Sequence, residues 1–211
     1  MIPELDCTEL SLEPVVLRRP EFKDVDLLYV YRNNLEVTRF LGGFSLGYSR
    51  QDLHDWIERH RSQTGDIIWV IADKASDRCL GHAGLYDVDH RVRSANFGML
   101  IGDETYRDRG LGQVVTQAVV DYGFDELNLH RIDLHVLATN PRAIHIYTKV
   151  GFKCEGILRD AQFRSGQYVD MVVMAMLEHE RERGSGFQWP EATASFPDFV
   201  QNAFDNSKVA G

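Results

Sequence analysis

Hydrophobic positions recur with two different periods along this chain, and the change of period separates strands from helices. Between residues 66 and 103 the apolar residues form short continuous or alternating runs such as "DIIWVIAD" (66–73), which are typical of buried β-strands. After residue 110 they return every three to four positions, as in a helix with one face in the core. This stripe comprises Leu111, Val114, Val115, Ala118, Val119 and Tyr122. The mixture of the two periods predicts an α/β fold.

The predicted elements follow the order β-α-α-β-β-β-α-β-α-β-β. Strands are expected at 15–20, 66–73, 78–89, 94–103 and 131–140 and in a last hairpin that turns at 164–167; helices are expected at 21–34, from Ser49 to Gly65, from Leu111 onward and at 141–150. Antiparallel strands come first and two strand–helix crossovers follow. We therefore expect a mixed, mostly antiparallel sheet of about seven strands with helices on both faces.

Local signals mark the ends of two of these helices. Ser49 and Asp52 are the first and fourth residues of "SRQD", a variant of the capping box. Asn140 followed by Pro141 is typical of a helix start, and Gly151 is typical of the position just past a helix end. The sequence therefore predicts capped helices after Ser49 and after Asn140.

Length, composition and charge indicate a single globular domain. A chain of 211 residues with 44% hydrophobic and 26% charged residues can bury a sizeable core. We expect one domain over residues 1–183 and a C-terminal extension over 184–211 that opens with the flexible sequence "GSG". The net charge of −9 argues against nucleic-acid binding and is compatible with a cationic substrate.

Cysteine and histidine usage bear on compartment and metal binding. Cys7, Cys79 and Cys154 are odd in number and far apart, which is not a disulfide framework and fits a reducing, cytoplasmic compartment. None of the eight histidines has metal-ligand spacing, so no metal is expected. The N-terminus lacks the features of a secretory signal and no run approaches 18 apolar residues, so neither a leader nor a membrane span is expected.

The turn "TYRDRGLGQ" (105–113) joins a predicted strand to a predicted helix. A helix start offers unpaired N–H groups and the positive end of the helix dipole. Gly110 and Gly112 let the backbone approach a ligand, and Arg107 and Arg109 add positive charge. The turn therefore has the chemistry of a phosphate site, although an ordinary tight turn with solvated arginines would have the same sequence.

A second segment of interest is "NPRAIHIYTKVGF" (140–152). Its apolar residues form a helical stripe. Taken alone, a tyrosine in such a stripe, here Tyr147, is more often a buried core residue than a catalytic acid. Combined with the turn, the pattern is more specific. R-x-x-G-x-G at 107–112, followed by N-x-x-A-x-x-x-Y-x-x-x-G-F at 140–152, resembles the GNAT superfamily of acetyl-CoA-dependent N-acetyltransferases. Within it, "SANFGMLIGDETYRDRGLG" resembles the branch of ribosomal-protein N-terminal and spermidine N-acetyltransferases.

The resemblance covers roughly residues 13–180 and implies a GNAT-like fold, acetyl-CoA as cosubstrate and transfer of acetyl to a primary amine. It assigns cofactor contacts to the strand before the turn, to the turn and to the second segment. These residues are Met99, Leu100, Ile101, Arg107, Asp108, Arg109, Gly110, Leu111, Gly112, Gln113, Asn140 and Ala143. The cofactor is expected in the gap where the strand over 94–103 splays away from the strand over 131–140.

The resemblance also implies that Tyr147 protonates the departing thiolate. A phenol with a pKa of about 10 suits a thiolate of similar basicity. The general base is less clear, because Asn96 stands where many relatives have a glutamate and an amide does not take up a proton. Either another group takes the role or the amine arrives already neutral. Asp87, Asp89 and Glu104 are the candidates for such a group, and each could instead be a solvated surface carboxylate.

The identity of the acceptor remains open at this stage. The resemblance places the acceptor pocket between the first two helices, the loop over 39–49 and the hairpin turn at 164–167, and this glycine-rich loop would suit a lid. A small amine or a peptide N-terminus would fit. The alternative, favoured by Asn96 in place of a glutamate, is a catalytically silent acyl-CoA-binding module.

The extension over 184–211 lies outside the resemblance. Phe196, Phe199, Val200, Ala203 and Phe204 have helical spacing, which predicts a short amphipathic helix. Such a helix needs a partner surface, because it is too short to be stable alone. It is expected to dock either on its own domain or on a second subunit, which would make a homodimer.

Overall fold

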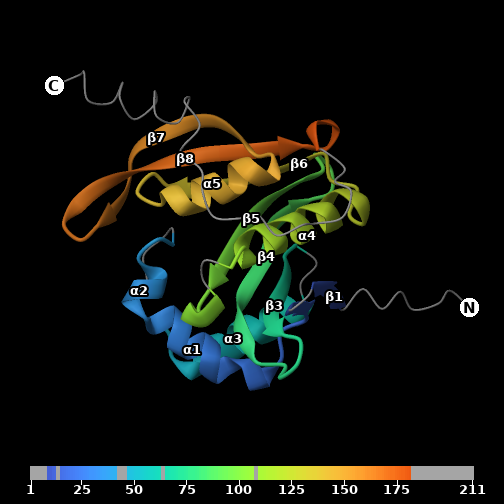
Figure 1. The fold of residues 1–211 in the computed structure, drawn as a ribbon, viewed down its shortest axis with the longest axis vertical. Helices are drawn as coiled ribbons and strands as arrows, with labels where there is room; N and C mark the ends of the chain where they lie inside the picture. The colour runs from blue at the N-terminus through green and yellow to red at the C-terminus, as the bar shows by residue number, and fades with distance from the viewer. Residues whose placement is uncertain (1–8, 13–14, 42–46, 63–64, 107–108, 182–211) are drawn as a thin grey trace, which may run out of the picture.

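The structure is a computed structural model that describes residues 9–12, 15–41, 47–62, 65–106 and 109–181. Its centre is an eight-stranded sheet in the order β1-β2-β3-β4-β5-β6-β8-β7 (Figure 1). The strands are β1 (Glu9–Leu12), β2 (Val15–Arg18), β3 (Ile67–Asp73), β4 (Cys79–Asp89), β5 (Ser94–Ile101), β6 (Arg131–Leu137), β7 (Lys153–Arg164) and β8 (Gln167–Leu177). Every neighbouring pair is antiparallel except β5 and β6, which run parallel.

The sequence predictions of element order and fold class are confirmed. All seven predicted strands are present, and β1 adds a short edge strand that four residues were too few to reveal. The helices are α1 (Val25–Asn33), α2 (Leu35–Thr38), α3 (Arg50–Ser62), α4 (Leu111–Asp125) and α5 (Pro141–Val150), with 3-10 turns at Phe22–Asp24, Glu104–Tyr106 and Glu178–Glu180. The sequence did not predict α2. The predicted helix over 196–204 lies outside the described residues.

Alternation along the strands sorts their side chains onto two faces. Trp69 and Ile71 pack in one core cluster with α4 and α5, whereas Val70 and Ala72, between and beyond them, pack in a second cluster with α1 and α3. Figure 1 shows α5, β7 and β8 together at one end of the molecule and α1 to α3 at the other. The sheet is therefore covered on both faces. In the described ranges, no helix is long and apolar enough to cross a membrane.

The predicted helix caps are present. The N–H of Ser49 donates to the Asp52 carboxylate (2.7 Å), and the N–H of Asp52 donates back to the Ser49 hydroxyl (3.1 Å). The Asn140 side chain accepts from the N–H of Ala143 (3.2 Å) at the start of α5, and Gly151 ends that helix with φ = 112°. These caps need only local sequence, which is why they were predictable.

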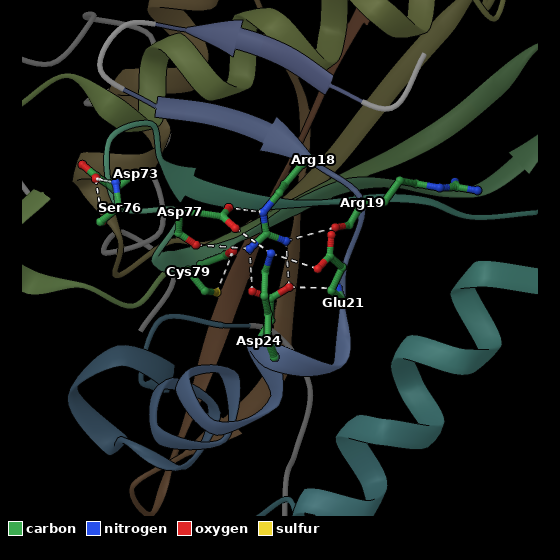
Figure 2. Close-up of polar contacts among 10 residues, drawn as sticks. Arg18, Arg19, Glu21, Asp24, Asp73, Ser76, Asp77 and Cys79 are labelled. Atoms are coloured by element: carbon green, nitrogen blue, oxygen red, sulfur yellow. Dashed lines mark hydrogen bonds and ion pairs between the residues drawn. The ribbon is translucent and has the colours of Figure 1, made fainter. Parts of the chain in front are cut away.

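A buried ion pair ties the first helix to the sheet. The Arg18 guanidinium at the end of β2 donates two hydrogen bonds to the Asp24 carboxylate, at 2.9 and 2.7 Å (Figure 2). Asp24 is only 2% exposed, so removal of either partner would leave a buried charge, which typically costs about 3–5 kcal/mol. Asp77, in the turn between β3 and β4, also pairs with Arg18. This cluster fixes where α1 starts relative to β2.

Candidate active site

The site is formed where two adjacent strands separate. β5 and β6 pair only at Ser94–Asn96 against Arg131–Asp133, and beyond these residues the two strands share no ladder. The N–H of Gly102 donates to the carbonyl of Leu80 on β4 (2.8 Å). Because residues of an antiparallel strand alternately face their partner and turn away from it, Met99 and Ile101 direct their backbone groups away from β4 and toward the gap. The predicted splay is confirmed.

A cavity of about 650 Å³ lies at this gap and is lined by residues from both faces of the sheet. Its lining residues come from α2, β4, β5, β6, β8, α5 and the start of α4. They are Glu36, Val37, Arg39, Phe40, Leu41, Tyr86, Asn96, Phe97, Gly98, Met99, Leu100, Ile101, Tyr106, Gly112, His135, Val136, Asn140, Pro141, Arg142, Ala143, Ile146, Tyr147 and Met171. A cavity of this size falls in the range of small-molecule and cofactor sites.

The structure gathers seven of the predicted site residues in this lining: Met99, Leu100, Ile101, Gly112, Asn140, Ala143 and Tyr147. Four more predicted site residues lie at the start of α4, on either side of Gly112, and do not line the cavity: Arg109, Gly110, Leu111 and Gln113. Arg107 and Asp108 lie outside the described residues. The predicted cofactor contacts therefore converge from two segments about 30 residues apart, as the two sequence motifs implied.

The turn before α4 has the backbone geometry of an anion site. Gly110 precedes the helix with φ = 76°, a left-handed conformation that favours glycine, and no side chain among the described residues caps the helix. The N–H of Gln113 donates to the carbonyl of Gly110 (3.0 Å), whereas the N–H groups of Leu111 and Gly112 have no partner among the described residues and can face a ligand. A Cβ at Gly112 would meet Ile146 Cδ1 at 3.2 Å and Met99 Cε at 3.5 Å, so this glycine allows the helix start to approach both α5 and β5.

Tyr147 lies on the α5 side of the cavity within a group of aromatic rings. Its ring meets the ring of Phe97 edge to face, with the centroids 6.0 Å apart, and contacts Phe152 at the same centroid distance. Burial raises the pKa of Tyr147 to about 12. Among the described residues its hydroxyl has no hydrogen-bond partner. The ring is thus held by the core while the protonated hydroxyl borders the cavity.

The opposite face of the gap carries polar residues that sequence reasoning did not select for the site. By strand alternation, Asn96 lies on the same face as Leu100, which packs with α1 and α3, and His135 lies on that face of β6. Tyr86, the neighbour of Asn96 on β4, covers Gly98, and burial raises its pKa to about 12. The signal available in the sequence was strand alternation itself, which puts these residues opposite the apolar core positions.

The three carboxylates considered as bases are not among the described lining residues. Asp87 and Asp89 are exposed at the end of β4, where Asp89 accepts from the N–H of Arg91 (2.7 Å) in the turn. Glu104 is exposed in the 3-10 turn beyond β5. Among the described lining residues the only carboxylate is that of Glu36, which is largely exposed and forms an ion pair with Arg39 (3.1 Å).

The loop and the hairpin predicted to shape the acceptor side do meet. Phe40 and Leu41, at the end of α2, line the cavity, and Arg164 at the tip of β7 donates a hydrogen bond to the carbonyl of Leu41. Residues 42–46 of the loop lie outside the described residues. The contact joins segments 123 positions apart in the chain and brings the hairpin next to the cavity-lining residue Leu41.

A buried histidine stabilises the sheet beneath this acceptor face. His82 on β4 lies 2.9 Å (Nε2) from the Arg32 Nη2 of α1, and Arg32 also lies over the ring of Trp56. Because a guanidinium only donates, Nε2 must accept and the imidazole must be neutral. Burial, with added repulsion from Arg32 and His60, holds the pKa of His82 well below its usual value.

Neither a metal cluster nor a reactive cysteine is found in the described part of the chain. Cys79 is buried and free, and burial raises the pKa of its thiol to about 12; Cys154 is half-buried and free. Neither sulfur lines the cavity. The chemistry of the site therefore rests on backbone groups, tyrosines, amides and a few charged side chains.

Comparison with known proteins agrees with this geometry. Residues 15–153 match the model of the Acetyltransferase (GNAT) domain. The spermidine N(1)-acetyltransferase of Escherichia coli is 32% identical over 81% of this chain and 89% of its own length, and an L-amino acid N-acetyltransferase of the same species is 28% identical over 79% of this chain and 100% of its own. A crystal structure of the Vibrio cholerae spermidine N-acetyltransferase with CoA and spermine superposes with a TM-score of 0.74 at 28% identity, over 80% of this chain and 98% of that one. The splayed strands, the uncapped helix start and these matches together show that the chain belongs to the GNAT family and is an acetyl-CoA-dependent N-acetyltransferase.

Proposed function

We propose that this enzyme acetylates a primary amine of a small polyamine such as spermidine, by direct attack of the amine and with Tyr147 as the general acid. The observation that carries the proposal is a single cavity that reaches both faces of the sheet through the gap between β5 and β6. Tyr147 borders it on the cofactor side, and Glu36 and Asn96 border it on the acceptor side. The silent-module alternative is not retained, since the family is that of an enzyme.

Direct attack is favoured by what the cavity lacks. Among the described residues, no serine, threonine, cysteine or lysine lines it, so the hydroxyl, thiol and amine nucleophiles most used for covalent catalysis are not found in the described lining. The backbone groups of Met99 and Ile101 that face the gap can instead stabilise charge developing on the acyl oxygen. Acetyl-CoA supplies the activated acyl group, and the residues that would hold it are those of the turn, of β5 and of the start of α5.

Tyr147 suits the acid role by its protonation state and its position. A phenol with a pKa of about 12 is protonated throughout the physiological range, so the proton is present when the thiolate departs. This pKa lies above the value of about 10 that would match a thiolate, so the support for Tyr147 comes from its position at the cavity. Its hydroxyl is not committed to another described residue, and its ring is held by Phe97 and Phe152. The hydroxyl can therefore donate its proton without first breaking a hydrogen bond to a described residue.

A polycationic acceptor is supported by charge and by the relatives. The Glu36 carboxylate at the cavity mouth is 66% exposed and its Arg39 partner 57% exposed, and such surface pairs contribute little stability. An ammonium group of a polyamine can therefore replace Arg39 at small cost. Two spermidine acetyltransferases, from Escherichia coli and Vibrio cholerae, cover 81% and 78% of this chain.

An amino acid acceptor is the second candidate. Arg39 and Arg142 both line the cavity, and their guanidinium groups suit a carboxylate. The relative that acts on L-amino acids matches along its whole length. A peptide N-terminus and the predicted homodimer and cytoplasmic location stay predictions.

An amine panel with acetyl-CoA tests the proposal, with release of the free thiol as the readout. The panel contains spermidine, spermine, single L-amino acids and a short peptide with a free N-terminus. We expect the highest kcat/KM for spermidine, and a rise in its KM in Glu36→Gln with little change in the KM of acetyl-CoA. Preference for an amino acid over spermidine would contradict the polyamine proposal and support the second candidate.

A further inference from the structure

Asn96 is held by a side chain from the neighbouring strand. It is the backbone partner of Asp133 in the last of the three parallel pairs between β5 and β6, immediately before the strands separate. Its Nδ2 donates a hydrogen bond to Asp133 Oδ1 over 2.9 Å. Asn96 lines the cavity, and Asp133 does not. The carboxylate therefore reaches the cavity only through the amide.

This bond decides which end of the amide is free. An ionised carboxylate only accepts hydrogen bonds, so the NH₂ end of Asn96 must face Asp133. The oxygen of Asn96 is then the end left for the cavity, and no described residue donates to it. With an uncharged or donating partner in place of Asp133, the two orientations of the amide would become similar in energy.

Asp133 is itself fixed from the other side. Arg131, two residues earlier on the same face of β6, donates from Nε to Asp133 Oδ2 (3.2 Å). The same guanidinium holds Glu155 of β7 with two bonds of 2.7 and 2.6 Å. The chain of contacts from Glu155 through Arg131 engages Asp133 Oδ2, while Oδ1 accepts from Asn96.

We propose that Asp133 is a positioning residue for the acceptor amine. It holds the Asn96 amide with its oxygen toward the cavity, and that oxygen accepts an N–H of the incoming amine as it approaches the gap. The amide orients the amine and removes no proton from it. This role replaces the carboxylate that the resemblance led us to expect at position 96, and it rests on an amine as acceptor but not on spermidine in particular.

A double-mutant cycle tests the coupling between the two residues. The variants are Asp133→Asn, Asn96→Ala and the combination of both, with initial rates measured at varied spermidine and at varied acetyl-CoA. Loss of one oriented hydrogen bond corresponds to roughly a tenfold change in affinity. We expect Asp133→Asn to raise the KM of the amine about five- to tenfold, with the KM of acetyl-CoA and the melting temperature nearly unchanged.

The decisive result is non-additivity. In the Asn96→Ala background, Asp133→Asn is expected to have no further effect on the KM of the amine, because Asp133 then has nothing to orient. Asp87→Asn is the matched control: it makes the same change at an exposed carboxylate that does not line the cavity, and it leaves the bond from Asn96 to Asp133 in place. Its amine KM should stay within about twofold of the unmodified enzyme.

Two outcomes would overturn the inference: an unchanged amine KM in Asp133→Asn, or additive effects of the two substitutions. A purely structural role of Asp133 would lower the melting temperature and change both Michaelis constants together. The unmodified enzyme is assayed first. If it does not acetylate spermidine, the proposed acceptor fails, and the cycle is run with the panel amine that does release thiol.

Discussion

The two sides of the gap between β5 and β6 are built in different ways. The side on which we propose that acetyl-CoA binds is made of backbone groups, a glycine, apolar side chains and two tyrosines, Tyr106 and Tyr147. Its described lining residues come from 99–106, Gly112 and 140–147. The acceptor side is made of side chains from α2, β4, β5, β6 and β8, which lie far apart in the sequence. The first depends on local conformation, and the second depends on how the whole sheet is assembled.

This difference explains what each side can specify. A turn that presents N–H groups binds the invariant part of a cosubstrate, and its geometry needs only a few glycines at fixed spacing. A surface of separate side chains can change one residue at a time, so it suits the part of the reaction that varies, namely the amine. Substitutions on the two sides should therefore affect different kinetic constants.

The largest effect is expected from Tyr147→Phe, which keeps the ring and removes only the proton. Loss of a general acid typically lowers the rate about 10²–10⁴-fold, so kcat should fall by that range while cofactor binding and the melting temperature persist. Tyr86→Phe is the matched control on the acceptor side, because its pKa is also raised to about 12 by burial. The steady-state kcat of both variants is measured. Equal losses of kcat in Tyr147→Phe and Tyr86→Phe would contradict a specific role for Tyr147.

The second prediction concerns a substitution that should disrupt only the proposed acetyl-CoA site. Gly110→Val places a β-branched residue at φ = 76° and a side chain at the helix start. We expect acetyl-CoA affinity to fall about tenfold or more, with the KM of the amine less affected. Gly166→Val is the control, since Gly166 has φ = 82° in the hairpin turn and open space around it. Calorimetry should show normal affinity in the control, and normal affinity in both would place the diphosphate elsewhere.

The smallest effect concerns the buried histidine His82 and the pH dependence of the free energy of unfolding. The pKa of His82 is depressed in the folded state, so its contribution to stability is present above its unfolded pKa of about 6.5 and is lost as the pH falls below it. Between pH 7 and pH 5 the enzyme should therefore lose about 1–2 kcal/mol more than His82→Gln, whose side-chain oxygen can still accept from Arg32. Arg32, His60 and Tyr86, which face this group, are common to both proteins.

Urea titrations at the two pH values measure this difference. Parallel losses in the two proteins would show that His82 already titrates normally in the fold. Since His82 is not among the described residues that line the cavity, the KM of acetyl-CoA should be the same in both proteins at pH 7.

The sequence by itself determined the order of elements, the caps at Ser49 and Asn140 and the cofactor motif around Gly110, because periodicity, capping and tight turns depend on residues within a few positions of one another. It also indicated Tyr147, whose spacing from Asn140 is that of two turns of one helix. Only the tertiary structure decided that Asn96 and Asp133, 37 residues apart, become hydrogen-bond partners. It also placed α2 at the cavity, so that the carboxylate in the described lining is Glu36. The carboxylates considered from the sequence, Asp87, Asp89 and Glu104, are not in that lining. Those outcomes depend on strand register and on where the sheet opens, which are set by the packing of the whole sheet and not by any single segment.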